Sequence, residues 1–172
     1  IKEVRENLLN ISHPVIAFTG AVDGYKFDRD RFRKVAADFP TYSFVIVGPV
    51  ALKDRKSSKK ELGFDKLSNI YLLDTVDFTV EPKYIANFDV MIIPYQLNDY
   101  TVGGCFPVKF FNYLAAGLPV VVTDLPTYSP FSDVCYISRN PNEFSQNVRR
   151  ALEENSHEKI RQREEQASKN TW

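Results

Sequence analysis

The segment between residues 95 and 109 contains residue types that are suited to binding an anion. It carries Gly103 and Gly104 and leads to Pro107 and Lys109 at the start of a predicted helix. The first N–H groups of a helix have no intrahelical acceptor and lie at the positive end of its dipole, so they bind phosphate readily. Lys109 opposes that dipole, and a bound anion would offset the cost. We therefore predict phosphate binding here, the alternative being that Lys109 points into water.

Two other loops contain glycine and basic residues. In "GPVALKDRK" (48–56), Gly48 permits close approach of the backbone to a ligand, and Lys53, Arg55 and Lys56 bring positive charge. A solvated basic loop is an equally good interpretation. The loop "GAVDGYKF" (20–27) lacks the G-x-G-x-x-G pattern, and no Walker lysine follows it, which argues against an ordinary dinucleotide or P-loop site.

The sequence offers little support for metal or nucleophilic chemistry. His13 and His157 lie near the two ends, with no Cys or carboxylate at ligand spacing, so we expect no metal site. Neither histidine is near a candidate nucleophile, and no Ser-His-Asp arrangement can be argued. The Asp residues at predicted strand ends are as often turn formers or helix caps as catalysts.

One polar residue interrupts the helix that follows the anion-binding segment. The pattern of residues 107–117 predicts a helix that begins at Pro107, a favoured first residue, and ends at Gly117. Asn112 would then lie in the middle of its apolar face, and the pattern alone does not explain its presence there.

Short apolar runs alternate with helical patterns along the chain. We predict strands at 15–20, 44–48, 69–74, 90–95, 119–124 and 134–138, helices at 28–40, 81–88, 107–117 and 140–155, and a charged helix after residue 156. Nearly unbroken apolarity is typical of parallel strands covered on both faces. The pattern predicts an α/β fold, an open parallel sheet of about six strands with helices on both faces. Ligands of such sheets bind beyond the carboxyl ends of the strands.

Composition narrows the class of protein. The chain has 172 residues, which suits one domain, and 44% of them are hydrophobic, enough for a sizeable core. Lys plus Arg and Asp plus Glu both number 22, so the net charge is zero, which argues against nucleic-acid binding driven by charge.

Cys105 and Cys135 are far apart, and we interpret them as reduced thiols of a cytoplasmic protein. No apolar run approaches the roughly 18 residues of a membrane span. The N-terminus has no signal-peptide features and no start Met, which suggests a piece of a longer protein.

Several motifs together resemble a known family. The segment "FPVKFFNYLAAGLPVVVTDLP" resembles the donor-binding segment of group 1 glycosyltransferases, which often read P-x-K-x-x-E-Y-L-A-A-G-x-P-V-V. "GAVDGYKFDRDRFRKVAADFPTYSFVIVGPV" and "NIYLLDTVDFTVEPKYIANFDVMIIPYQLNDYT" are similar to the family's preceding strands and helices. The terminal "NTW" resembles its Asn-Ser-Trp. The resemblance covers residues 14–172.

The resemblance implies the GT-B architecture, in which two Rossmann-like domains enclose the active site. Residues 14–172 would be the C-terminal, donor-binding Rossmann-like domain, and residues 1–13 a linker or helical segment before it. The N-terminal, acceptor-binding domain would be absent from this chain. The expected partner is a nucleoside-diphosphate-sugar, with no cofactor, and a membrane would be involved only through a lipid-linked acceptor. The implied location is cytoplasmic or peripheral at the inner face of the membrane.

The resemblance also assigns roles by position. The N–H groups of Val108 and Lys109 would hold the donor diphosphate, and Lys109 would be catalytic by stabilising the leaving group. Asn112 replaces the glutamate that usually bonds the ribose, and Gly104 falls where another glutamate faces the sugar. Ala21 replaces an arginine that helps the diphosphate, although Lys26 lies nearby. The remaining expected contacts with substrate are those of Gly20, Gly48, Pro49, Asp74, Thr75 and Thr101.

Other functions stay open at this point. The first hypothesis is a metal-independent glycosyltransferase of bacterial surface polysaccharide synthesis. The second is a pseudoenzyme or binding module, in which the altered positions 104 and 112 have ended catalysis. A sugar-nucleotide epimerase and a flavodoxin-like signalling domain are minor alternatives. Trp172 is expected either to pack on the domain or to precede further chain.

Overall fold

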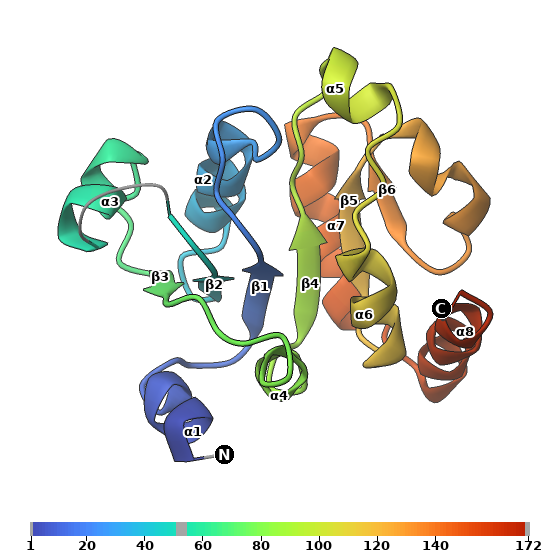
Figure 1. Ribbon diagram of the computed structural model, residues 1–172, viewed down its shortest axis with the longest axis horizontal. Coiled ribbons are helices and arrows are strands. Elements are labelled where there is room, and N and C mark those ends of the chain that lie inside the picture. The colour runs from blue at the N-terminus through green and yellow to red at the C-terminus, as the bar shows by residue number, and fades with distance from the viewer. Residues whose placement is uncertain (1, 51–54, 171–172) are drawn as a thin grey trace.

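A single parallel sheet organises the chain. The computed structural model describes residues 2–50 and 55–170, so Lys53 and Trp172 lie outside the described residues. The strands stand in the order β3-β2-β1-β4-β5-β6, and every neighbouring pair is parallel (Figure 1). The predicted α/β fold is therefore confirmed. The strands are β1 (Val15–Thr19), β2 (Ser43–Val47), β3 (Ile70–Leu73), β4 (Val90–Ile93), β5 (Val120–Thr123) and β6 (Tyr136–Ser138).

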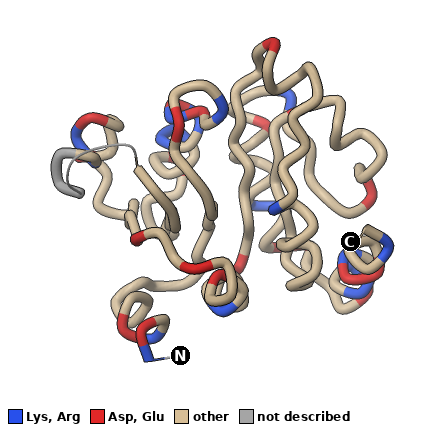
Figure 2. Tube along the Cα trace, in the orientation of Figure 1, with Lys and Arg blue, Asp and Glu red and all other residues tan. Residues whose placement is uncertain are grey.

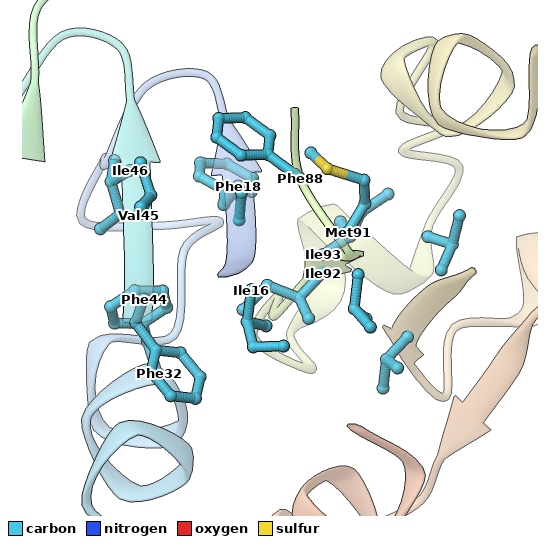
Figure 3. Close-up of a cluster of buried hydrophobic side chains, with 14 of the residues drawn as sticks. Ile16, Phe18, Phe32, Phe44, Val45, Ile46, Phe88, Met91, Ile92 and Ile93 are labelled. Atoms are coloured by element: carbon cyan, nitrogen blue, oxygen red, sulfur yellow. The ribbon is translucent and has the colours of Figure 1, made fainter. Parts of the chain in front are cut away.

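The central strands are buried on both faces, as their apolar sequences require. All residues of β1, β2, β4 and β5 are buried, and Figure 2 shows that the charged residues gather on helices and loops instead. Ala17 of β1 lies between Val45 and Met91 on its two neighbours. Aromatic rings extend this core outward; Phe32 packs edge-on against Phe44, with 6.0 Å between ring centroids (Figure 3).

Helices cover both faces of the sheet. In Figure 1, α2 and α7 are neighbours on one face, and α4 and α6 lie on the other with α8 packed outside α6. The helices are α1 (Lys2–Leu8), α2 (Arg29–Asp38), α3 (Arg55–Glu61), α4 (Glu81–Ile85), α5 (Asp99–Val102), α6 (Lys109–Ala115), α7 (Pro141–Glu153) and α8 (His157–Ser168), with a 3₁₀ helix, η1 (Pro126–Phe131).

Side-chain caps explain where three of these helices begin. Asp28, Asn140 and Ser156 precede α2, α7 and α8 and accept hydrogen bonds from the backbone N–H three residues further on, at 2.9, 2.9 and 3.3 Å. Each cap satisfies one of the N–H groups that a helix start leaves without an acceptor. Helix α1 lies within residues 1–13, for which a linker or helical segment was expected. Three short helices were not predicted: α3 begins at Arg55, and α5 and η1 fall in segments expected to be loops.

The helix α6 starts later than its sequence predicts. Its first helical residue is Lys109 rather than Pro107, and Val108 is its N-cap. The reason is local: the Pro107 carbonyl accepts the first bond, from the N–H of Phe110 at 2.9 Å, so Pro107 lies outside the helix.

The other end of α6 is fixed by Gly117 and by helix α8. Gly117 has a φ of +72°, and the N–H of Leu118 bonds the carbonyl of Tyr113 at 3.3 Å, which is a Schellman ending. Arg163 of α8 is buried and donates from Nη1 to the Gly117 carbonyl at 3.0 Å and to Asn155 Oδ1 at 2.7 Å. Helix α8 therefore holds α6 in place.

Replacing Gly117 with alanine should destabilise the protein by about 2–4 kcal/mol. An L-residue at this φ costs roughly 1–2 kcal/mol, and the added Cβ would lie 2.8 Å from Ile160 Cγ2. Urea denaturation monitored by circular dichroism measures the change. Gly24→Ala is the control, because its Cβ would meet no atom within 4 Å; equal losses in the two variants would contradict this account.

Candidate functional site

A cavity of about 190 Å³ opens at the carboxyl ends of β1, β2 and β3. It lies on the side of the sheet edge where the loops from the strands meet helices α4 and α6. Such crevices at the carboxyl edge are where open α/β sheets bind ligands. The residues that line it are Thr19, Gly20, Val47, Gly48, Pro49, Thr75, Val76, Glu81, Lys109 and Asn112.

The cavity brings together residues that are far apart in the sequence. Six of the residues predicted to contact substrate line it: Gly20, Gly48, Pro49, Thr75, Lys109 and Asn112. The parallel sheet explains this convergence, because the strand ends lie side by side at one edge.

Two glycines allow the chain to close around one wall of the cavity. Gly20 has a φ of +132° and Gly48 one of +150°, both unfavourable for other residues. A Cβ on Gly48 would lie 2.3 Å from the carbonyl oxygen of Gly20, and a Cβ on Gly20 would lie 2.1 Å from Nζ of Lys109. The loops after β1 and β2 pass so close to each other and to Lys109 that no side chain fits at Gly20 or Gly48.

Lys109 is the positive charge of the cavity. Its Nζ donates to the carbonyl of Thr19 at 2.6 Å and lies 4.3 Å from the centroid of the Phe18 ring. Burial lowers the pKa of Lys109 to about 8, although the charge of Glu81 acts in the opposite direction. The alternative that Lys109 points into water is therefore wrong.

Sequence reasoning missed a network around the end of β1. Oε1 of Glu81, the first residue of α4, accepts a hydrogen bond from the Thr19 hydroxyl. The N–H of Thr19 donates to the hydroxyl of Tyr113 at 3.0 Å, and burial raises the pKa of that phenol above its usual range. Glu81 directly follows the loop after β3. A carboxylate at the end of that loop was the sequence signal that could have placed Glu81 at the carboxyl edge of the sheet.

Asn112 lies on the opposite side of α6 from that predicted. Phe110, Tyr113 and Leu114 form the buried side of the helix, whereas Asn112 is exposed and lines the cavity. The expectation that it interrupts an apolar face is wrong, because the face turned toward the core is set by residues 110, 113 and 114. Among the described residues, no group hydrogen-bonds its side-chain amide, which is therefore available to a ligand.

The start of α6 leaves backbone donors free beside the cavity. Within the described chain, the N–H groups of Val108 and Lys109 have no hydrogen-bond acceptor, while those of Phe110 and Phe111 bond to the carbonyls of Pro107 and Val108. Val108 is 59% exposed, so water or a ligand can reach these donors.

Lys26 lies in a loop held next to this region. Its Nζ is 3.3 Å from Asp23, and its carbonyl accepts from the N–H of Gln96 at 2.7 Å. Burial acts to lower the pKa of Lys26, but the hydrogen bond and charge of Asp23 outweigh it and the net shift is upward. Lys26 also lowers the pKa of Lys109, so the two ammonium groups sense each other.

Five predicted residues lie outside the cavity lining: Lys26 and Val108, described above, and Asp74, Thr101 and Gly104. The hydroxyl of Thr101 donates to the Gln96 carbonyl at 2.6 Å and the residue is buried, so it fixes the turn into α5. Gly104 has a φ of +135° with open space around it. Asp74 is exposed and is the first residue after β3.

Other hollows and clusters carry less chemistry. Hollows of about 570 Å³ beside α2 and α3 and about 280 Å³ beside β6 and α7 have mainly polar walls and no close glycine approach to a lysine. In the part of the chain that the structure describes, no three His, Cys, Asp or Glu residues gather as a metal site would require. None of the described helices is long and apolar enough to cross a membrane. The side chains of Arg55 and Lys56, at the start of α3, are not among those described.

Comparisons with known proteins show the family to which the chain belongs. Residues 13–154 match the family model for glycosyl transferases group 1. The putative teichuronic acid biosynthesis glycosyltransferase TuaH of Bacillus subtilis (strain 168) is 34% identical over 115 residues, which are 67% of this chain and 28% of TuaH. The chain thus spans little more than a quarter of this curated relative.

Solved structures share the fold at low sequence identity. HepE of Anabaena superimposes with a TM-score of 0.74 and 13% identity, over 98% of this chain and 47% of HepE. The lipopolysaccharide glycosyltransferase WaaG gives a TM-score of 0.64 and 17% identity, over 97% of this chain and 46% of WaaG. The fold thus corresponds to one half of a GT-B structure, and the family match over most of its length shows that this chain belongs to the group 1 glycosyltransferases.

Proposed function

We propose that this chain is the donor-binding half of a group 1 glycosyltransferase. In this proposal, the cavity at the carboxyl ends of β1, β2 and β3 receives the nucleoside diphosphate of a sugar donor. The observation that carries it is that the largely buried Lys109 ammonium lines the cavity and that two free backbone N–H groups, those of Val108 and Lys109, lie beside it at the start of α6. Charge and N–H donors together are what a diphosphate requires.

The diphosphate would lie between the loop after β1 and the start of α6. Lys109 uses one N–H on the Thr19 carbonyl, which leaves two for phosphate oxygens. The free N–H groups of Val108 and Lys109 add two donors, and Lys26 adds charge from the neighbouring loop. Gly20 lets the phosphates approach the backbone closely, because no side chain stands there.

The nucleoside would occupy the part of the cavity under β2 and β3. Gly48 and Pro49 supply backbone and an apolar ring, and Thr75 offers backbone groups for the edge of the base, with Asp74 beside it. Asn112 lines the same cavity and offers an uncharged amide to the ribose. Thr101 would position the loop before α6, and Gly104 would face the sugar.

The reaction would be transfer of the sugar to an acceptor held by another part of the protein. When the bond from the sugar to the diphosphate breaks, negative charge develops on the leaving phosphate. Lys109 and the N–H groups at the start of α6 stabilise that charge from fixed positions, so no metal ion is needed for this step. The acceptor-binding half is proposed to lie in the remainder of the longer protein.

The relatives point to bacterial polysaccharide synthesis. The name of TuaH concerns teichuronic acid, that of WaaG lipopolysaccharide, and HepE was solved in complex with UDP. We extend these to a donor of the nucleoside-diphosphate-sugar class and an acceptor of a bacterial glycoconjugate, reached at the membrane only through a lipid-linked substrate.

A second candidate is a pseudoenzyme that binds the donor without transferring it. The exposed amide of Asn112 and the absence of any side chain at Gly104 favour it, since both positions lack the carboxylates that the family usually carries. The two candidates share the same cavity and differ only in turnover.

Nucleotide affinity should fall as the pH rises through about 8. Only the protonated Lys109 attracts a diphosphate, and its pKa in the free protein is about 8. Because the bound anion favours the protonated form, affinity is highest below pH 8, and at pH 9 we expect a loss of about tenfold. Calorimetry with UDP and GDP from pH 7.5 to 9.5 measures it.

The Lys109→Met variant provides the control for this pH dependence. It should bind at least tenfold more weakly at pH 7.5 and show no further loss up to pH 9.5, because the pKa of Lys26 is shifted upward and that group stays charged. A variant that keeps the wild-type slope would remove Lys109 from the site.

Turnover separates the two candidates. The full-length protein should release nucleoside diphosphate from its donor, and Lys109→Met should lower kcat by about 10²–10³-fold, the usual effect of removing one group that stabilises developing charge. Coupled detection of the released diphosphate gives the rate. Tight donor binding without hydrolysis or transfer would favour the pseudoenzyme, and an epimerised donor would indicate an epimerase.

A further inference from the structure

Glu81 is the only carboxylate among the described residues that line the cavity. We propose that Glu81 receives the ribose hydroxyls of the nucleotide, and so supplies the carboxylate that Asn112 cannot. This inference rests on the proposed nucleotide site and names a residue for one of its subsites. It assigns to helix α4 a part in recognition that neither the helix sequence nor the resemblance indicates.

The structure holds the Glu81 side chain at a fixed place. One oxygen, Oε1, accepts the hydrogen bond from the hydroxyl of Thr19, which is buried at the end of β1. Among the described residues, no hydrogen bond or ion pair engages Oε2. A carboxylate oxygen has two acceptor positions, so Oε2 can accept from both members of a vicinal diol or share them with Oε1.

The Glu81 carboxylate is not neutralised by an ion pair with Lys109, so it can accept hydrogen bonds from an uncharged group of a ligand. Glu81 and Lys109 line the same cavity, yet no contact within 4.0 Å joins them as an ion pair. The two opposite charges are therefore separate attachment points. A nucleoside diphosphate matches them, with anionic phosphates for Lys109 and hydrogen-bond donors on the ribose for Glu81.

Asn112 has the complementary role in this arrangement. Its amide lines the cavity from α6, while Glu81 lines it from α4. An amide gives uncharged hydrogen bonds, which are weaker than those to a carboxylate. A glutamate at both positions would place two negative charges in one small cavity, so the cavity accommodates the carboxylate on one helix at a time.

A purely structural role for Glu81 makes a different prediction. Its bond to Thr19 and its place in the first turn of α4 would stabilise the fold without touching a ligand. Glu81→Gln tests this directly, because glutamine keeps an acceptor for the Thr19 hydroxyl and removes only the charge.

Nucleotides that lack one ribose hydroxyl reveal the subsite. Calorimetry on this chain compares UDP and GDP with their 2′-deoxy and 3′-deoxy forms. The wild type should lose about 10–30-fold in affinity on removal of a hydroxyl, the range for one charge-assisted bond. Glu81→Gln should bind all forms within about threefold of one another. Glu158→Gln, on the exposed side of α8, is the matched control and should keep the wild-type ratio.

The outcomes separate this inference from the function on which it rests. If Glu81→Gln keeps the wild-type ratio, or if the wild type does not distinguish the deoxy forms, Glu81 does not hold the ribose while the nucleotide site still stands. If no nucleotide binds the wild type at all, the donor site falls and this inference with it.

Exchanging the carboxylate between the helices is a second test. Asn112→Glu alone should bind nucleotide no better than the wild type, because it adds a like charge beside Glu81. The double variant Glu81→Gln, Asn112→Glu should bind nucleotide at least tenfold more tightly than Glu81→Gln alone. Equal affinities for Glu81→Gln with and without Asn112→Glu would contradict the exchange.

Discussion

The last residue of β1 holds the parts of the cavity together. The carbonyl of Thr19 accepts from Lys109, its N–H donates to Tyr113, and its hydroxyl donates to Glu81. These three side chains come from α6 and α4, which are joined to β1 by no short connection. Since β1 lies in the middle of a buried parallel sheet, the side chains hydrogen-bonded to Thr19 are held in place by the core. A site that stabilises developing charge needs such fixed positions.

The cavity combines opposite charges without neutralising either. Lys109 and Glu81 are both hydrogen-bonded to Thr19, one to its carbonyl and one to its hydroxyl, and no ion pair within 4.0 Å joins them. A direct ion pair would satisfy both charges internally and leave little for a ligand. Instead, in the proposed site each would retain capacity for a different part of one nucleotide, and the two charges together would set its orientation.

The fold could be predicted from the sequence because its signals are local and agree with one another. Apolar runs mark all six strands, and Asp28 and Asn140 mark two helix starts. The candidate site was predictable in part: glycines and Lys109 in segments after strand ends pointed to the edge of the sheet at which the cavity opens. Glu81 was missed because nothing in the spacing says that α4 turns its first residue toward β1. The side of α6 on which Asn112 lies depends on tertiary packing, which periodicity over seven residues does not determine.

Helix α8 connects the outer surface of the domain to the cavity. Arg163 bonds the carbonyl of Gly117, just after the end of α6, and the first turn of α6 carries Lys109. Docking of α8 and occupancy of the cavity thus act on the two ends of one short helix, and thermodynamic linkage makes each favour the other. If nucleotide binds in the cavity, amide hydrogens along α8 should therefore exchange more slowly, although no residue of α8 lines the cavity. Exchange in the C-terminal helix would in this sense report on whether the candidate site is occupied.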